Sequence, residues 1–215
     1  MPAVEVKICG LTRPDAAAVC VAAGASYLGV IFASGPRVVT ATVAGEVVHA
    51  AEGRPVLGVF GAQRVEEILR IRDAAGLSGA QLHGDQPVEV AARLRRAGLL
   101  VWRVARLAGP GELDGLPSFA EEADLVLVEP RVPALAGGAG VALDLDLGRA
   151  ARIRLGACRM ALAGGLRPEN VAEAVLRVHP DVVDVSSGVE RAPGWKDPGQ
   201  VIRFMEAALG PFPPA

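Results

Sequence analysis

The chain has 215 residues with a formal net charge of −2 at pH 7, and 51% of its residues are hydrophobic. This composition suits one domain with a large core, and it lacks the basic field that favours nucleic acid or an anionic membrane surface. No apolar run reaches the roughly 18 residues that a membrane span needs. No signal-peptide pattern precedes the first expected strand, so we expect a cytoplasmic protein.

Cysteine and lysine usage narrows the chemistry further. The chain contains Cys9, Cys20 and Cys158 but no CxxC pair, which argues against a disulfide framework and a zinc site. Among 22 basic residues only Lys7 and Lys196 are lysines. Because lysine is a compact point charge whereas arginine is a planar fork, a lysine kept in so arginine-rich a chain is a candidate for a chemical role.

Short runs rich in β-branched residues recur along the chain, and most are apolar on both faces, as buried parallel strands are. The predicted strands are 4–8, 27–32, 55–60, 79–83, 99–105, 124–129, 159–164 and 181–187. Segments with helical periodicity lie between them, and Gly24, Gly76 and Gly98 stand where helix C-caps are expected. Two segments, 109–123 and 142–154, are less regular, and we expect short or irregular helices there.

Eight strands alternating with helices predict an α/β protein, a single-domain (β/α)8 TIM barrel over residues 1–210 with a frayed tail at 211–215. A doubly wound open sheet is the competing fold. Its dinucleotide fingerprint, GxGxxG after the first strand, is missing.

Such a barrel has its active site at the C-terminal ends of its strands. Residues at those ends include Lys7 and Cys9 on the first strand, Arg103 on the fifth, Glu129 on the sixth and Asp184 on the eighth. Polar and reactive side chains from distant parts of the sequence are therefore predicted to meet at one mouth.

The loops after the seventh and eighth strands have the composition of a phosphate cradle. One contains Gly164 and Gly165 and the other contains Ser187 and Gly188. Glycines let the backbone approach an anion closely, and helix N-termini offer unpaired N–H groups. These loops are the usual phosphate site of TIM barrels, so we expect a small phosphorylated substrate. The alternative is that Gly164 and Gly165 only form a tight turn.

Lys7 and Cys9 are two residues apart on one strand, so both side chains can face the barrel interior. A cysteine acts as a base or nucleophile when its pKa falls below the free value of about 8.5, and a nearby lysine favours this. The alternative for a lone cysteine is a small core hydrophobe. We expect that role for Cys20 and Cys158.

Three other residues are candidates for binding or proton transfer. Glu129 ends an apolar strand, where burial would raise its pKa and suit a general acid; a solvated loop acid is the alternative. The fork of Arg37 could clamp a carboxylate. His83 could bind a ligand or be a buried histidine already satisfied by hydrogen bonds. No second histidine or carboxylate lies at metal-ligand spacing, so we expect no metal.

These strand ends, in chain order, resemble the phosphoribosylanthranilate isomerase family of tryptophan biosynthesis. The matching stretches are KICGLT, SGPR, GVF, QLHGD, the glycines at 137, 138 and 140, LAGGLRPENV, and VDVSSGVE with PGWKD. The resemblance covers nearly the whole chain, and Lys7, Lys196 and the single asparagine, Asn170, all lie within it.

The resemblance implies an Amadori rearrangement without a cofactor. The aminoaldose N-(5-phosphoribosyl)anthranilate becomes 1-(2-carboxyphenylamino)-1-deoxyribulose 5-phosphate. By this resemblance Cys9 is the general base and Arg37 holds the anthranilate carboxylate. The other expected contacts are Lys7, His83 and Asp184 with the substrate, and Gly164, Gly165, Ser187 and Gly188 with its phosphate.

One departure from the family matters for catalysis. The family's general acid is an aspartate, and here Glu129 stands at that position. Glutamate has a similar intrinsic pKa but adds one methylene of reach, so catalysis should survive if the carboxyl group is placed correctly. The family's usual lysine near Val141 and aromatic residue near Leu145 are also missing.

Two other functions stay open at this point. One is a different sugar-phosphate enzyme on the same scaffold, and the other is a catalytically impaired barrel that only binds a phosphorylated ligand. Family members occur as monomers, dimers and parts of fused chains, so a homodimer is one form to expect.

Overall fold

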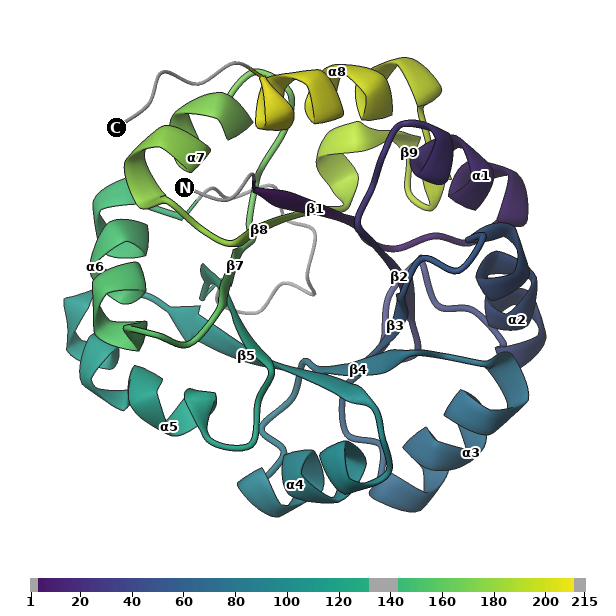
Figure 1. The fold of residues 1–215 in the computed structure, drawn as a ribbon, viewed down its shortest axis with the longest axis horizontal. Helices are drawn as coiled ribbons and strands as arrows, with labels where there is room; N and C mark the ends of the chain where they lie inside the picture. Colours follow the sequence, from purple (N-terminus) through teal and green to yellow (C-terminus); the bar gives the residue numbers. More distant parts are fainter. Residues whose placement is uncertain (1–3, 132–142, 211–215) are drawn as a thin grey trace.

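The computed structural model describes residues 4–131 and 143–210. Eight parallel strands form a closed barrel in chain order, with β8 paired back to β1, and helices surround them (Figure 1). The strands are β1 (Glu5–Ile8), β2 (Tyr27–Ile31), β3 (Val56–Phe60), β4 (Gly79–Leu82), β5 (Leu100–Leu107), β6 (Leu125–Pro130), β7 (Met160–Leu162) and β8 (Val182–Val185). The predicted TIM barrel is therefore confirmed.

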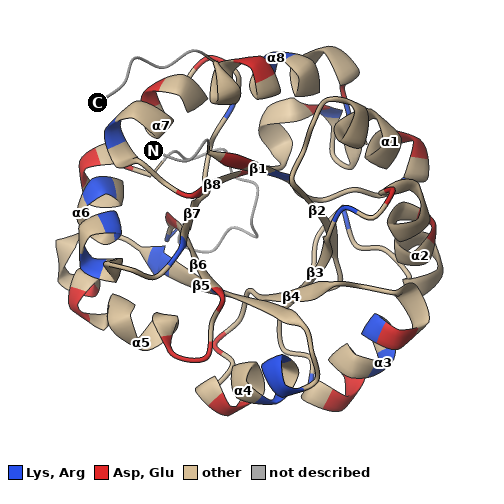
Figure 2. Ribbon diagram, in the orientation of Figure 1, with Lys and Arg blue, Asp and Glu red and all other residues tan. Residues whose placement is uncertain are grey.

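The outer layer consists of helices that follow the strands. They are α1 (Pro14–Ala22), α2 (Ala41–Ala50), α3 (Val65–Ala75), α4 (Val88–Arg96), α5 (Leu116–Ala120), α6 (Leu145–Leu155), α7 (Val171–Val178) and α8 (Pro198–Leu209). Gly24, Gly76 and Gly98 all have positive φ angles, as helix C-caps require. Charged residues gather on these helices and the loops and are sparse on the strands (Figure 2).

The two segments for which we expected short or irregular helices, 109–123 and 142–154, differ from each other. The first forms a 3₁₀ helix, η1 (Pro110–Gly115), and then the short helix α5, as expected. The second forms the regular helix α6, and Asp144 caps it by accepting from the backbone N–H groups of Asp146 and Leu147. The expectation of a short or irregular helix there is wrong, because the capping side chain compensates for a weak hydrophobic pattern.

Alternation along the strands separates two cores. Outward-facing residues pack beneath the helices in one large cluster, whereas inward-facing residues fill the barrel. The inner cluster comprises Leu57, Trp102, Val104, Leu125, Leu127, Ala161, Ala163 and Val182. Because side chains alternate with a period of two, the same parity continues beyond this cluster to the C-terminal ends of the strands and points their polar residues into the mouth.

Beyond β8 the chain makes a 3₁₀ turn, η2 (Ser187–Val189), and a small antiparallel hairpin of β9 (Glu190–Ala192) and β10 (Trp195–Lys196). No helix within the described residues is long and apolar enough to cross a membrane. The predicted frayed tail at 211–215 and the glycines at 137, 138 and 140 lie outside the described residues, as does Val141.

Candidate active site

Lys7 lies at the centre of the barrel interior. Its side chain is fully buried, and Nζ donates to Asp184 Oδ1 at 2.8 Å and to Gln81 Oε1 at 3.0 Å. Nζ also lies 5.6 Å from the ring centroid of Trp102. Burial alone would lower the pKa of Lys7, but the charges of Asp184 and Cys9 outweigh it and the pKa is raised. This enclosed position favours a role through its neighbours over direct contact with substrate.

Cys9 lies one step higher on the same inward face, and a glycine on the neighbouring strand makes room for it. A Cβ added to Gly29 would lie 2.8 Å from Cys9 Sγ and 3.2 Å from Lys7 Cε. A side chain at this position of β2 would displace both residues. Gly29 is thus a residue of the site that sequence reasoning missed; its only trace in the sequence is a glycine inside an otherwise hydrophobic strand.

The ionisation of Cys9 differs from the expectation. Burial raises the pKa of the thiol, the positive charge of Lys7 opposes this, and Asp184 reinforces it; the net pKa is above its usual value. The condition of a lowered pKa is therefore not met in this structure, because loss of hydration outweighs the nearby lysine. Burial and Asp184 thus favour the neutral thiol of Cys9, whereas Lys7 favours its thiolate.

Glu129 faces the mouth from β6. Its Oε1 accepts from Arg106 Nε at 2.9 Å and lies 3.6 Å from His83 Nε2. Arg106 also donates to the backbone carbonyl of His83. Burial raises the pKa of Glu129 although Arg106 opposes it, as the general-acid prediction requires. Burial lowers the pKa of His83 to about 4, with Arg106 contributing, so the ring is neutral at pH 7.

Arg106, and not Arg103, is the strand-end arginine of the site. The fifth strand runs to Leu107, past the predicted end at 105. Arg103 points outward, where it donates to the carbonyl of Ser118 at 2.7 Å and lies over the ring of Phe119. The prediction for Arg103 is wrong because the strand end was placed too early. The parity of inward-facing Trp102 would have identified Arg106.

Arg37 packs close to Cys9 above a glycine that cannot be replaced without a clash. Gly10 has φ +74°, and an added Cβ would lie 2.7 Å from Arg37 Cδ and 2.8 Å from Ser186 Oγ. One edge of the Arg37 guanidinium is already occupied. Nε and Nη2 donate to the Glu190 carboxylate at 2.9 Å and 2.7 Å. Any carboxylate of a substrate must therefore use the remaining edge.

The two predicted phosphate loops lie against each other. Gly164 and Gly165 have φ angles of +99° and +60°, and Asn170 Nδ2 donates to the Gly165 carbonyl at 3.0 Å. A Cβ on Gly188 would overlap the carbonyl oxygen of Leu166. Within the described residues the Gly165 N–H has no acceptor. Ser187 begins η2, directly before Gly188. The structure therefore brings the four residues predicted to bind phosphate into two adjoining turns with backbone donors.

The remaining histidines and cysteines lie away from the mouth. His49 is exposed on α2 and His179 is half-buried at the end of α7. Cys20 is buried in the outer core, and Cys158 is half-buried against it. In residues 4–131 and 143–210 no three His, Cys, Asp or Glu side chains are grouped so that they could hold a metal ion.

The match to known proteins follows the barrel along nearly its whole length. Residues 6–207 match the family model of N-(5′-phosphoribosyl)anthranilate (PRA) isomerase. The chain is 40% identical to the N-(5′-phosphoribosyl)anthranilate isomerase of Rubrobacter xylanophilus over 206 residues, which cover 95% of this chain and 98% of that protein.

Solved structures give the same result. A phosphoribosylanthranilate isomerase in complex with reduced 1-(o-carboxyphenylamino)-1-deoxyribulose 5-phosphate is 30% identical, with a TM-score of 0.85 and coverage of 96% of this chain and 99% of that one. A monomeric form of the dimeric phosphoribosylanthranilate isomerase from Thermotoga maritima is 31% identical, with a TM-score of 0.83 and the same coverage.

Proposed function

The chain belongs to the N-(5′-phosphoribosyl)anthranilate isomerase family, and on that premise we propose how its mouth performs the reaction of tryptophan biosynthesis that defines the family. The reaction is the Amadori rearrangement of N-(5′-phosphoribosyl)anthranilate to the aminoketose. The family assignment displaces the alternative of another sugar-phosphate enzyme on this scaffold. The proposal for the chemistry rests on the placement of Cys9 directly after β1 and of Glu129 on β6, with the Lys7–Asp184 pair close enough to influence the pKa of both.

In the proposed mechanism Glu129 is the general acid. Its protonated carboxyl group donates to the furanose ring oxygen, which breaks the C1–O bond and leaves a Schiff base. Burial supports this role because it raises the pKa of Glu129. Arg106 fixes the carboxyl group at 2.9 Å, which supplies the positioning that a longer side chain needs in place of the family's aspartate.

Cys9 is the proposed general base. Its thiolate removes the proton from C2 of the Schiff base, and the resulting enolamine tautomerises to the ketone. Burial works against the thiolate, whereas Lys7 and, to a lesser degree, Lys196 favour it. Lys7 stays protonated because Asp184 pairs with it. We therefore assign Lys7 to stabilising the Cys9 thiolate and Asp184 to keeping Lys7 charged, and we assign neither to direct substrate contact.

Binding of the substrate uses the rest of the mouth. We assign the substrate carboxylate to the remaining edge of Arg37, the phosphate to Gly164, Gly165, Ser187 and Gly188, and a place beside the sugar to His83. The orientation then puts the reacting carbons between Cys9 and Glu129.

The overall activity is tested by following anthranilate-type fluorescence as the purified protein acts on freshly made N-(5′-phosphoribosyl)anthranilate, without added metal or cofactor. We expect rapid turnover that the reduced product analogue inhibits. Tight binding of that analogue without turnover would instead identify a catalytically impaired barrel.

The acid assignment makes a sharper prediction about pH. The active form needs a protonated Glu129 and an ionised Cys9, although their pKa values start from 4.5 and 9.0 and burial raises both. Between the two pKa values the fraction in this form is small but constant, so kcat/KM should rise with pH, level off, and then fall.

Glu129→Gln should remove the level region. Turnover of the variant should be about 10²-fold lower at pH 7 and should rise with pH as the thiolate forms, since no carboxyl group loses its proton in parallel. Glu66→Gln, a change of an exposed acid on α3, is the matched control. A variant profile with the wild-type shape would reject Glu129 as the acid.

We also propose that the protein is a cytoplasmic homodimer, since a dimeric relative has the same barrel. Light scattering with size-exclusion chromatography tests this directly, and a mass of one chain of 22.1 kDa across the micromolar range would contradict the dimer.

A further inference from the structure

Two motif residues have no assigned contact with the substrate in the mechanism above, yet both side chains are buried beside it. They are Glu190, from the stretch VDVSSGVE, and Lys196, from PGWKD. The side chains of Arg37, Glu190 and Lys196 are only 8%, 4% and 1% exposed. Charged groups are rarely buried this deeply unless they are paired, so the cluster calls for a functional or structural reason.

A chain of bonds connects the three side chains. Glu190 accepts from Arg37 through Nε and Nη2, and its Oε1 also accepts from Lys196 Nζ at 2.7 Å. Lys196 donates further to the backbone carbonyl of Ser186 at 3.0 Å. Burial alone would raise the pKa of Glu190, but these two cations bring it below its usual range, so Glu190 is a carboxylate at pH 7.

Hydrogen bonds of the β9–β10 hairpin connect this cluster to the rest of the fold. Glu190 and Lys196 face each other as partners in the β9–β10 hairpin. The hairpin is tied at both ends, because Asp197 N donates to the Val189 carbonyl at 2.9 Å and Thr12 Oγ1 donates to the Gly194 carbonyl at 2.7 Å. Arg37 arrives from the loop after β2, so the hairpin fixes an arginine that its own loop, largely exposed, would leave free to rotate.

The Arg37 fork keeps one edge open for an anion. Glu190 uses the edge formed by Nε and Nη2 and also accepts from Lys196. Within the described residues Arg37 Nη1 makes no hydrogen bond, so the open edge of the fork is available to an anionic group of a ligand. A planar guanidinium donates two parallel hydrogen bonds to a carboxylate.

We propose that Glu190 and Lys196 are positioning residues that hold the Arg37 guanidinium in the orientation that binds the substrate carboxylate. This inference rests on the proposed role of Arg37. Glu190 fixes one edge of the guanidinium and thereby aims the other, and Lys196 keeps Glu190 in place and compensates its charge. Preorganisation of this kind increases affinity because less side-chain freedom is lost on binding.

The test compares two ligands by calorimetry. One is reduced 1-(o-carboxyphenylamino)-1-deoxyribulose 5-phosphate, and the other is the same compound without the ring carboxylate. The quantity of interest is the ratio of their dissociation constants. A residue that acts through Arg37 should change this ratio, whereas a residue that only stabilises the fold should weaken both ligands alike.

We expect Glu190→Gln to lower the preference for the carboxylate ligand about tenfold and to change binding of the other ligand less than threefold. Lys196→Gln should act in the same direction, and it provides the test if Glu190→Gln fails to fold. Glu5→Gln, which also removes a carboxylate bound by an arginine but at the opposite end of the barrel, should leave the ratio unchanged.

The outcomes separate the inference from its premise. If Arg37→Ala weakens both ligands equally, the premise fails, because Arg37 does not bind the carboxylate. If Arg37→Ala is selective but Glu190→Gln and Lys196→Gln are not, the positioning role fails alone. Tighter binding of the carboxylate ligand to Glu190→Gln would also overturn the inference, since Glu190 would then compete with the ligand.

Discussion

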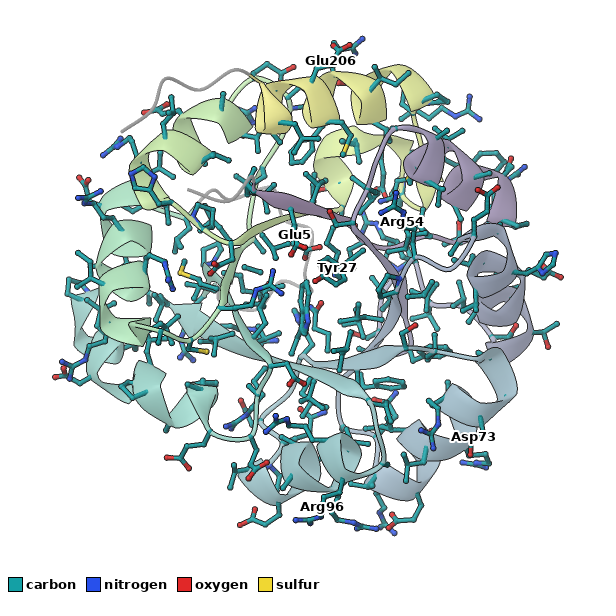
Figure 3. All side chains as sticks on the ribbon, in the orientation of Figure 1. Glu5, Tyr27, Arg54, Asp73, Arg96 and Glu206 are labelled. Carbon is teal, nitrogen blue, oxygen red and sulfur yellow. The ribbon has the colours of Figure 1, made fainter. Side chains whose placement is uncertain are left out.

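The two ends of the barrel interior are built by the same strands but differ in the exposure and the hydrogen bonding of their polar side chains. Along β1 and the residue after it, inward-facing residues run from Glu5 at the N-terminal end through Lys7 to Cys9 at the mouth. At the N-terminal end Glu5 accepts from Arg159 and from Tyr27 Oη at 3.3 Å. Glu5 and Tyr27 lie inside the ring of strands, whereas Asp73, Arg96 and Glu206 lie at the periphery (Figure 3).

Exposure differs sharply between these ends. The side chains of Glu5 and Arg159 are 39% and 45% exposed, whereas those of Lys7 and Asp184 are 0% and 10% exposed. Water screens the first pair, and such surface pairs contribute about 0–1 kcal/mol. The second pair is enclosed beneath the mouth, where breaking a pair leaves a buried charge and costs about 3–5 kcal/mol.

Satisfaction of polar groups differs as well. Glu5, Tyr27 and Arg159 bond to one another, and Tyr27 packs edge-on against Trp102 with ring centroids 5.1 Å apart. At the mouth, His83 Nδ1 and Ser186 Oγ are buried and have no hydrogen-bond partner among the described residues. A barrel end that only closes the fold can satisfy its groups internally, whereas an end that binds substrate must keep some of them available.

The largest expected effect is a loss of catalysis when the proposed base at the mouth is removed. Cys9→Ala removes the proposed base at the mouth, so kcat should fall about 10³-fold while the melting temperature changes little. Cys20→Ala, in the outer core, is the matched control and should alter stability without a comparable loss of kcat. Measurement of both quantities for both variants checks this, and full turnover by Cys9→Ala would remove the distinction between the ends.

A second variant tests the packing at the mouth and leaves its ionisable groups unchanged. Gly29→Ala puts a Cβ 2.8 Å from Cys9 Sγ, so we expect kcat/KM to fall about tenfold and the free energy of unfolding to fall by about 1–3 kcal/mol. Gly111→Ala, where an added Cβ meets nothing within 4 Å, is the control. Unchanged kinetics in Gly29→Ala would show that the mouth is less tightly packed than the structure indicates.

A third prediction concerns how the free energy of unfolding depends on pH through His83 at the mouth. Its pKa is about 4 in the folded protein against an ordinary value of 6.5, so below pH 6.5 the unfolded chain gains a proton that the folded mouth does not. Stability should therefore fall between pH 6.5 and 4, by up to about 3 kcal/mol. Urea titrations should show a weaker fall for His83→Asn, whereas His49→Asn on exposed α2 should behave as wild type. Equal slopes in the two variants would contradict a neutral, buried His83.

The smallest effect is expected at the N-terminal end. Glu5→Gln weakens a screened ion pair, so the free energy of unfolding should change by less than about 1 kcal/mol, and kcat and KM should stay at their wild-type values. Denaturant titration and kinetics together check this. A loss of activity would mean that charge at one end reaches the other through Tyr27, Trp102 and Lys7.

Much of this molecule follows from local pattern. The eight apolar runs determined the strands, and the glycines after three helices determined their ends, because strand burial and the left-handed cap are set by neighbouring residues. The strand-end motifs determined the family. The period of two also placed Lys7 and Cys9 on one face, and that spacing needs no knowledge of the rest of the chain.

Only the tertiary structure decided how the site residues interact. The bond between Arg37 and Glu190 joins residues 153 positions apart, and the pairing of Arg106 with Glu129 depends on where β5 ends. The raised pKa of Cys9 depends on how completely the barrel excludes water, which outweighs the lysine two residues away. Burial and long-range pairing are properties of the packed chain, so the sequence could name candidates for the reacting groups but could not state their charge or their partners.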